Sequence, residues 1–120
     1  MLQKTENFTQ QEIYIWFNNT FCLTHQPDRM MIFSIPNGGN RDAREGKTLK
    51  NTGLLAGASD LIVVLPNKVL FIEVKTSTGI QSTVQKDFEN RVLKLNHDYF
   101  IVKSLQDFKD IIAKFIPFAH

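Results

Sequence analysis

Apolar side chains recur every three or four residues in three stretches of the chain, and each stretch begins at a residue that can cap a helix. Thr9 and Glu12 fit a T-x-x-E capping box, which predicts a helix over residues 10 to about 22. Ser82 and Gln85 fit the same box, and Ser104 begins the third stretch. The apolar positions are Ile13, Trp16, Phe17 and Phe21, then Val84, Phe88, Val92 and Leu95, then Leu105, Phe108, Ile111, Ile112 and Phe115.

Four shorter apolar runs predict β-strands, at residues 30–35, 61–65, 69–74 and 99–103. Pro66-Asn67-Lys68 separates the middle two runs, which predicts a β-hairpin. Both of these strands are apolar at nearly every position, so we expect a sheet that is covered on both faces. A polar stretch at 41–52 is compatible with one more helix that ends at Gly53. The order α-β-(α)-β-β-α-β-α predicts an α/β fold, with a mixed β-sheet flanked by helices.

The composition supports one globular domain over residues 1–120. Hydrophobic residues make up 42% of the chain and include ten Phe, so a substantial core is expected. No apolar run is long enough to cross a membrane, and the first residues lack the apolar region of a secretory signal. Cys22 is the single cysteine, which excludes an intramolecular disulfide and a thiolate zinc cluster. We therefore expect a cytoplasmic protein without membrane contact, in which Cys22 packs as a small apolar residue.

The net charge of +2 is too small to indicate a nucleic-acid partner by itself. Its distribution says more, because residues 37–50 carry four basic against two acidic side chains, and the rest of the chain carries ten against ten. The basic side chains of this segment are Arg41, Arg44, Lys47 and Lys50. They could contact DNA phosphates or simply form a solvated polar face. The three histidines share no spacing typical of a metal site.

The hairpin places two acidic residues opposite each other. If it closes symmetrically about Pro66-Asn67, Leu61 faces Ile72 and the next pair is Asp60 with Glu73, whose Cβ atoms would lie about 5 Å apart. Like charges at this spacing repel, and a divalent cation such as Mg²⁺ or Mn²⁺ would resolve the conflict. Lys75 follows on the same side of the strand and could assist an attacking water. The alternative is a solvated hairpin end with a surface ion pair.

Asp60, then twelve residues, then Glu73-Val74-Lys75 resembles the D…ExK core of the PD-(D/E)xK nucleases, with Ser59 where these usually carry proline. The chain resembles more specifically the VRR-NUC (virus-type replication-repair nuclease) branch. The further matching pieces, which together span roughly residues 8–113, are the first helix with Glu12, Asn37-Gly38-Gly39, the glycines Gly53 and Gly57, Thr76, Gly79, Ser82 with Gln85, and the closing strand and helix.

The resemblance implies a restriction-endonuclease-like core and metal-dependent hydrolysis of DNA phosphodiester bonds. It implies that Asp60, Glu73 and the backbone carbonyl of Val74 bind the metal, and that Lys75 is the catalytic lysine. It also brings Gln85 and Glu12 to the active site, although a position in a capping box would explain each of them equally well. We expect Asn37, Arg41, Arg44, Lys47, Lys50 and Thr76 to contact DNA.

The resulting prediction is a Mg²⁺- or Mn²⁺-dependent endodeoxyribonuclease without a nucleotide cofactor. As the resemblance implies, it would act as a homodimer on junctions, including four-way (Holliday) junctions, or on flaps, in a DNA-repair or phage setting. The alternatives are a catalytically silent DNA- or partner-binding module with the same fold, and a sequence-specific restriction-type nuclease. The apolar residues Phe115, Ile116 and Phe118 exceed the needs of a last helical turn, and we predict that they join a dimer interface.

Overall fold

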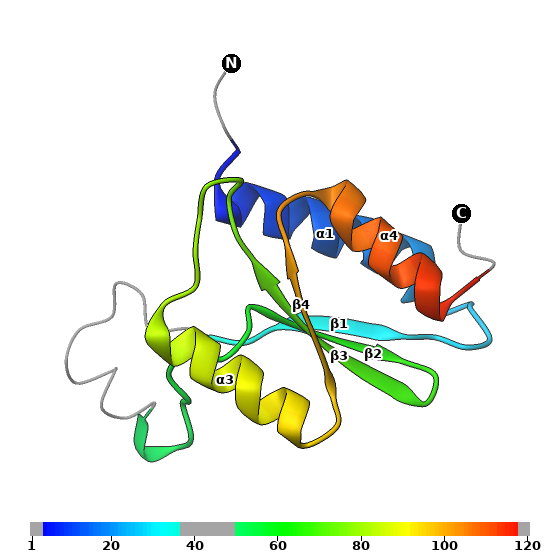
Figure 1. Cartoon of the computed structure of the whole chain (residues 1–120). Coiled ribbons are helices and arrows are strands. Elements are labelled where there is room, and N and C mark those ends of the chain that lie inside the picture. The colour runs from blue at the N-terminus through cyan, green and yellow to red at the C-terminus, as the bar shows by residue number, and fades with distance from the viewer. Residues whose placement is uncertain (1–3, 37–49, 118–120) are drawn as a thin grey trace.

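The computed structural model describes residues 4–36 and 50–117. Along the chain, the elements are α1 (Glu6–Phe21), β1 (Met31–Ser34), β2 (Leu61–Leu65), β3 (Lys68–Val74), α3 (Thr83–Lys94), β4 (Asp98–Val102) and α4 (Leu105–Phe115). The strands form a sheet in the order β1-β2-β3-β4, in which β1, β2 and β3 are antiparallel and β4 runs parallel to β3. Helices α1 and α4 lie on one face and α3 on the other (Figure 1). The predicted mixed α/β sheet is confirmed.

The hairpin of β2 and β3 has the predicted register. Leu65 pairs with Lys68 and Leu61 with Ile72, so the next two residues outward are Asp60 and Glu73. The turn places Asn67 at φ 59°, while Pro66 keeps the negative φ that its ring imposes. This is the residue preference of a type II turn, with Pro first and a residue that tolerates the left-handed region second.

The first helix begins one turn earlier than the sequence pattern suggested. Thr5 is its cap, and the Thr5 hydroxyl accepts a hydrogen bond from the Phe8 backbone N–H at 3.1 Å. Thr9 lies buried inside the helix, so the capping box predicted at residues 9–12 is wrong. The other two caps are confirmed. Ser82 and Gln85 form a reciprocal capping box, and Ser104 accepts from the Asp107 backbone N–H.

The larger core fills the space between the sheet and the helices α1 and α4. Ile13, Phe17, Val63 and Phe108 are fully buried there, and Cys22 packs at the same core, as predicted. Phe17 and Phe108 contact each other edge to face, with ring centroids 5.9 Å apart. This packing fixes the hairpin against two helices and so holds its acidic end in place.

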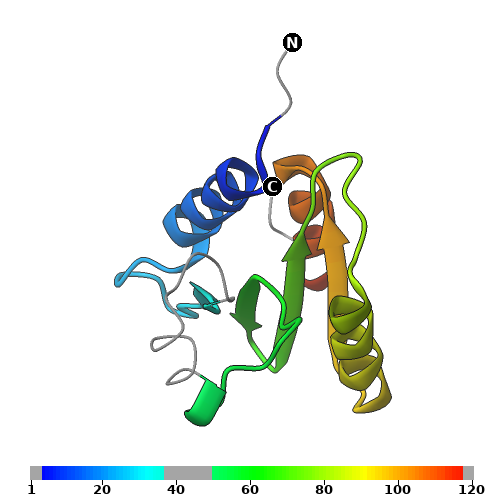
Figure 2. The same cartoon turned by 90° about the vertical axis from the view of Figure 1, so that its left-hand side faces the viewer.

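A smaller core lies under α3. Phe88 and Val92 of this helix pack on Tyr99 of β4, Phe71 of β3 and Ala58, while the predicted partners Val84 and Leu95 are exposed. Helix α3 lies beside β3 and β4 and away from β1 (Figure 2). Among the described residues, no element packs over β1 and β2 on this face, where Met31 and Phe33 are exposed. No helix in the two described ranges could span a membrane.

Candidate active site

The site lies at the open end of the hairpin, on the face of the sheet that carries α3. Asp60 directly precedes β2, and its carboxylate Oδ2 accepts a hydrogen bond from the Val74 backbone N–H at 2.7 Å. The Asp60 backbone carbonyl accepts from the Ile35 N–H at 3.0 Å. Asp60 is therefore held from both neighbouring strands, with its carboxylate directed at the end of β3.

Glu73 is buried beside Asp60, with 1% of the residue exposed. Its Oε2 accepts from Gln85 Nε2 at 3.0 Å and lies 3.6 Å from Lys75 Nζ. Its Oε1 is buried and has no hydrogen-bond partner among the described residues. Burial and, after it, the charge of Asp60 raise the pKa of this carboxyl to about 8, while Lys75 acts in the opposite direction. Glu73 thus has an oxygen that needs a proton or a cation.

Gln85 connects the start of α3 to the acidic pair. Its Oε1 accepts two hydrogen bonds at 2.8 Å, one from the Ser82 backbone N–H and one from Lys75 Nζ, while its Nε2 donates to Glu73. Gln85 is therefore both a helix cap and a neighbour of the candidate catalytic residues. Lys75 is buried too, and its backbone N–H donates to the Val102 carbonyl of β4 at 2.9 Å.

Gly57 allows the loop before Asp60 to lie against the first turn of α3. Its φ is +82°, and a Cβ added there would lie 2.3 Å from the Val84 carbonyl oxygen and 2.9 Å from the Gln85 backbone nitrogen. A side chain at this position would displace either the loop or the helix start. Glycine is thus needed at position 57 for the close approach of the loop to α3 and for the positive φ of the backbone.

A cavity of about 710 Å³ opens in front of the acidic pair. Asp60, Glu73 and Gln85 form one wall, together with the loop 54–58. Glu6 of α1 and Lys50 also line the cavity. The acidic residue of α1 that lines this cavity is therefore Glu6, which the sequence did not single out.

The predicted Glu12 does not line the cavity, and its carboxylate binds Lys4 at 3.1 Å. Six residues turn a helix by about 600°, so Glu6 and Glu12 face directions roughly 120° apart. The acidic residue directly after Thr5, the true cap, was the signal in the sequence that could have identified Glu6.

The remaining predicted site residues fall into two groups. Lys50 is exposed and lines the cavity, and Thr76, which directly follows Lys75, is half-buried and accepts a hydrogen bond from the Gly79 N–H through its carbonyl. The predicted DNA contacts Asn37, Arg41, Arg44 and Lys47 lie outside the described residues.

The acidic pair fits a metal that keeps part of its hydration shell. Within residues 4–36 and 50–117, no group of three His, Cys, Asp or Glu side chains is placed to hold a metal ion. Asp60 and Glu73 therefore supply two carboxylates, one of them with a buried oxygen that has no partner. Mg²⁺ is commonly bound by one or two carboxylates together with several waters, so the donor set suits Mg²⁺ better than a metal that needs a complete protein cage.

No protein-family model matches the sequence, and no match is found among curated proteins. Among solved structures, the chain is similar to a VRR_NUC domain protein, with a TM-score of 0.75 and 20% sequence identity. The match covers 98% of this chain and 92% of that one, so it includes both the sheet and the helices that form the site. At this level of identity the likeness establishes the fold, and the fold implied by the sequence resemblance is confirmed. The chain has the fold of a VRR_NUC domain protein.

Proposed function

We propose that the chain is a metal-dependent endodeoxyribonuclease of VRR-NUC type, which acts as a homodimer on branched DNA. The observation that carries this proposal is the buried Glu73 oxygen without a partner, next to Asp60 and within reach of a buried lysine. A structural ion pair does not account for it, because Lys75 lies near Oε2 of Glu73 and leaves the buried Oε1 without a partner, beside a second carboxylate.

Asp60 and Glu73, with the Val74 backbone carbonyl, would hold Mg²⁺, or Mn²⁺ in its place. When bound, such an ion lowers the pKa of a coordinated water and stabilises negative charge on a phosphoryl group. The protein's part is to aim both carboxylates at one point. The Val74 N–H does this for Asp60, and the Gln85 amide does it for Glu73.

Lys75 would act on the reacting phosphate. Its Nζ is held by the Gln85 oxygen at 2.8 Å and lies at the edge of the acidic pair. In hydrolysis, a water oxygen attacks the phosphorus and the bond to one bridging oxygen breaks, which leaves a phosphate on one DNA end and a hydroxyl on the other. Lys75 would orient the attacking water and stabilise the charge that develops on the phosphate. Glu6, across the cavity, would orient further waters.

DNA would approach the cavity past Lys50, which lines it. The neighbouring basic residues Arg41, Arg44 and Lys47, with Asn37, would add phosphate contacts, and Thr76 would contact the strand beside Lys75. Each phosphate that a basic side chain neutralises makes binding more sensitive to salt.

The test is a panel of linear, nicked, flap and four-way DNA incubated with Mg²⁺, Mn²⁺ or EDTA. We expect product on branched substrates with either metal and none in EDTA, and a loss of at least a hundredfold in rate for Asp60→Ala and Glu73→Ala. Glu6→Gln and Glu12→Gln form a matched pair on one helix, and only the first should slow the reaction. Cleavage in EDTA, or at the wild-type rate in either alanine variant, would overturn the proposal. Binding to every substrate without product would favour the silent module instead.

A further inference from the structure

The cavity in front of the acidic pair is not polar throughout. Five apolar residues line it, and we call them the apolar lining: Leu54, Leu55, Ala56, Ala58 and Val84. Leu55 is 43% exposed and Val84 is 49% exposed, so both side chains are accessible to a ligand. A hydrated Mg²⁺ ion is bound through oxygens, and a DNA phosphate is bound through basic and polar groups. Neither of them accounts for an apolar surface at this place.

The apolar lining is held in a fixed position next to the acidic pair. Ala58 is buried in the small core under α3, and its N–H donates to the Leu55 carbonyl at 3.2 Å, which closes the loop into a turn. The close approach of Gly57 to the Val84 carbonyl holds this loop against the first turn of α3 (Figure 1). Val84 directly precedes Gln85, and Ala58 lies two residues before Asp60. One ligand can therefore contact both the apolar lining and the acidic pair.

The cavity suits a ligand that is apolar at one end and anionic at the other. Its volume of about 710 Å³ lies within the range of pockets that enclose a small molecule. Lys50 lines the cavity, and Lys75 lies at the acidic pair, so basic groups are present at the polar end. A DNA nucleotide has the matching chemistry, because its phosphate is anionic and the two faces of its base are apolar.

Only an unpaired nucleotide can bring its base to the apolar lining. In a duplex each base lies between its neighbours, and a protein that encloses a base takes it out of the stack and holds it between aromatic or apolar side chains. The free energy of unstacking is smallest where the base is already unpaired. The apolar lining therefore favours the nucleotides of a single strand over those of a fully paired duplex.

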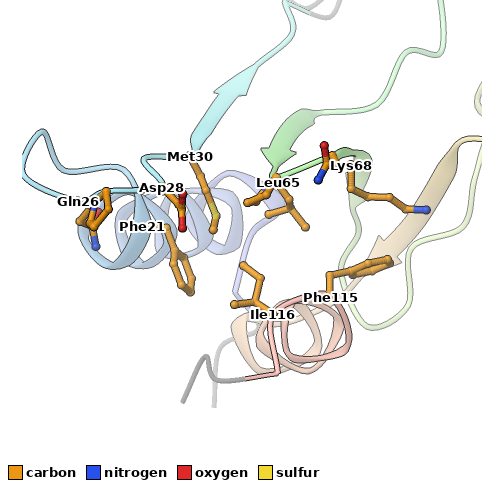
Figure 3. A pocket seen from close by; sticks show the side chains of 11 residues that line it. Phe21, Gln26, Asp28, Met30, Leu65, Lys68, Phe115 and Ile116 are labelled. Atoms are coloured by element: carbon orange, nitrogen blue, oxygen red, sulfur yellow. The ribbon is translucent and has the colours of Figure 1, made fainter.

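A second apolar hollow lies at the end of α4, where the sequence predicted a dimer surface. It has a volume of about 720 Å³ and lies between α1, α4 and the hairpin turn (Figure 3). Its lysine, Lys68, is paired with Asp98 at 2.7 Å and lies over the Phe115 ring. Ile116 and Phe115 pack on the larger core of the chain itself, and Phe118 lies outside the described residues. With its lysine already paired, this hollow suits a nucleotide less well than the active-site cavity does.

We propose that the active-site cavity binds one unpaired deoxynucleotide, with its base on the apolar lining and its phosphate at Asp60, Glu73 and Lys75. This inference deepens the proposed function and rests on it for the position of the phosphate. The contact selects a nucleotide by its lack of pairing and not by the identity of its base, because apolar side chains offer no hydrogen bond to a base edge. It is also less sensitive to salt than the phosphate contacts are.

The experiment compares two single-stranded oligonucleotides of equal length and charge: a thymidine oligomer, and an abasic analogue that keeps the sugars and phosphates but lacks the bases. Binding is measured by fluorescence anisotropy in EDTA at low salt, for the wild type, Leu55→Asn and the control Leu93→Asn. Leu93 is 49% exposed on α3 and does not line the cavity. We expect the wild type and Leu93→Asn to bind the abasic analogue at least tenfold more weakly than the thymidine oligomer, and Leu55→Asn to lose most of this preference. If circular dichroism shows that Leu55→Asn is unfolded, Val84→Thr takes its place.

Equal affinity for the two oligonucleotides would overturn the proposal, because sugar and phosphate alone would then account for binding. A folded Leu55→Asn that keeps the full preference would overturn it too, as would a wild type that does not bind the thymidine oligomer. Cleavage of flap and fully paired DNA in Mg²⁺ is measured in parallel. If the base preference is found but no DNA is cut, the nucleotide site stands and the proposed nuclease function fails. If DNA is cut without a base preference, the nuclease function stands and the nucleotide site fails.

Discussion

Replacing Glu73 by Gln should stabilise the metal-free protein near neutral pH while abolishing the nuclease reaction. Burial, together with the charge of Asp60, raises the pKa of the Glu73 carboxyl to about 8 from an ordinary value of 4.5. Between these two values the unfolded chain has lost the proton and the folded chain keeps it. The folded state then binds more protons than the unfolded state, so the free energy of unfolding falls as the pH rises through this window.

The size of the effect follows from the width of the window. Each pH unit between about 5 and 8 lowers the free energy of unfolding by roughly 1 kcal/mol. From pH 5 to 7.5 the loss is on the order of 3 kcal/mol, which corresponds to a fall in Tm on the order of 10 °C for a domain of this size. The Gln side chain is neutral at every pH in this range. It can still hydrogen-bond with Gln85. Glu73→Gln therefore removes the fall of the free energy of unfolding with pH and keeps the shape of the side chain.

The assay is thermal unfolding by circular dichroism in EDTA at several pH values, read as the difference between the wild type and Glu73→Gln. We expect nearly equal Tm values at pH 5 and a higher Tm for the variant at pH 7.5. Mg²⁺ should raise the wild-type Tm at pH 7.5 and leave the variant unchanged, because the ion replaces the proton on the acidic pair. Glu12→Gln is the control, since that carboxylate is paired with Lys4 on the surface. A wild-type Tm that does not fall relative to Glu73→Gln as the pH rises would refute the reasoning.

Two further predictions concern the start of α3. Gly57→Ala should lower both the Tm and the cleavage rate, the latter at least tenfold, whereas Gly53→Ala should lower only the Tm by a few degrees. Both glycines have positive φ, but only the first would bring a Cβ against the helix; equal rates for the two variants, measured on one substrate, would contradict this. Gln85→Glu keeps an acceptor for the Ser82 N–H but places a third carboxylate against Glu73. We therefore expect a folded protein with at least a hundredfold lower rate, and a rate near that of the wild type would assign Gln85 to the cap alone.

The hairpin and its acidic end could be predicted from the sequence because local signals determine them. Two β-branched runs of similar length flank Pro66-Asn67, and a two-residue turn leaves one register in which every residue keeps its side of the sheet. The opposition of Asp60 and Glu73 follows from that register without knowledge of the rest of the fold. The burial of Lys75 follows as well, because it continues β3 next to β4.

The partner residue on α1 could not be predicted with the same certainty. Thr5 and Thr9 lie one turn apart, and both are followed by acidic residues and an apolar stripe. The choice between them depends on packing, because Thr9 is buried inside the helix while Thr5 accepts the Phe8 N–H. The resemblance selected Glu12 for the site, whereas the acidic residue of α1 that lines the cavity is Glu6, the first residue after the cap.

The cover of the sheet shows a different limit. Ile62 and Val64 have the apolar character of buried strand residues, and the sequence predicted a sheet that is covered on both faces. Apolar character indicates that a side chain is buried, but not which element covers it. The position of α3 depends on its own packing, because this helix contacts Phe71 and Tyr99 and lies away from β1.

The alternatives for Gln85 could not be separated from sequence because one amide satisfies both. Its oxygen must face two donors, the Ser82 N–H and Lys75 Nζ, and its nitrogen must then face Glu73. The cap fixes the side chain on the helix, and the fixed side chain in turn positions the lysine and the carboxylate. In a capping box the N3 side chain bonds to the backbone N–H of the cap residue, which restrains Gln85 at the start of α3. A small domain that needs a rigid amide beside its acidic pair therefore obtains it at a helix start, where the backbone already supplies the restraint.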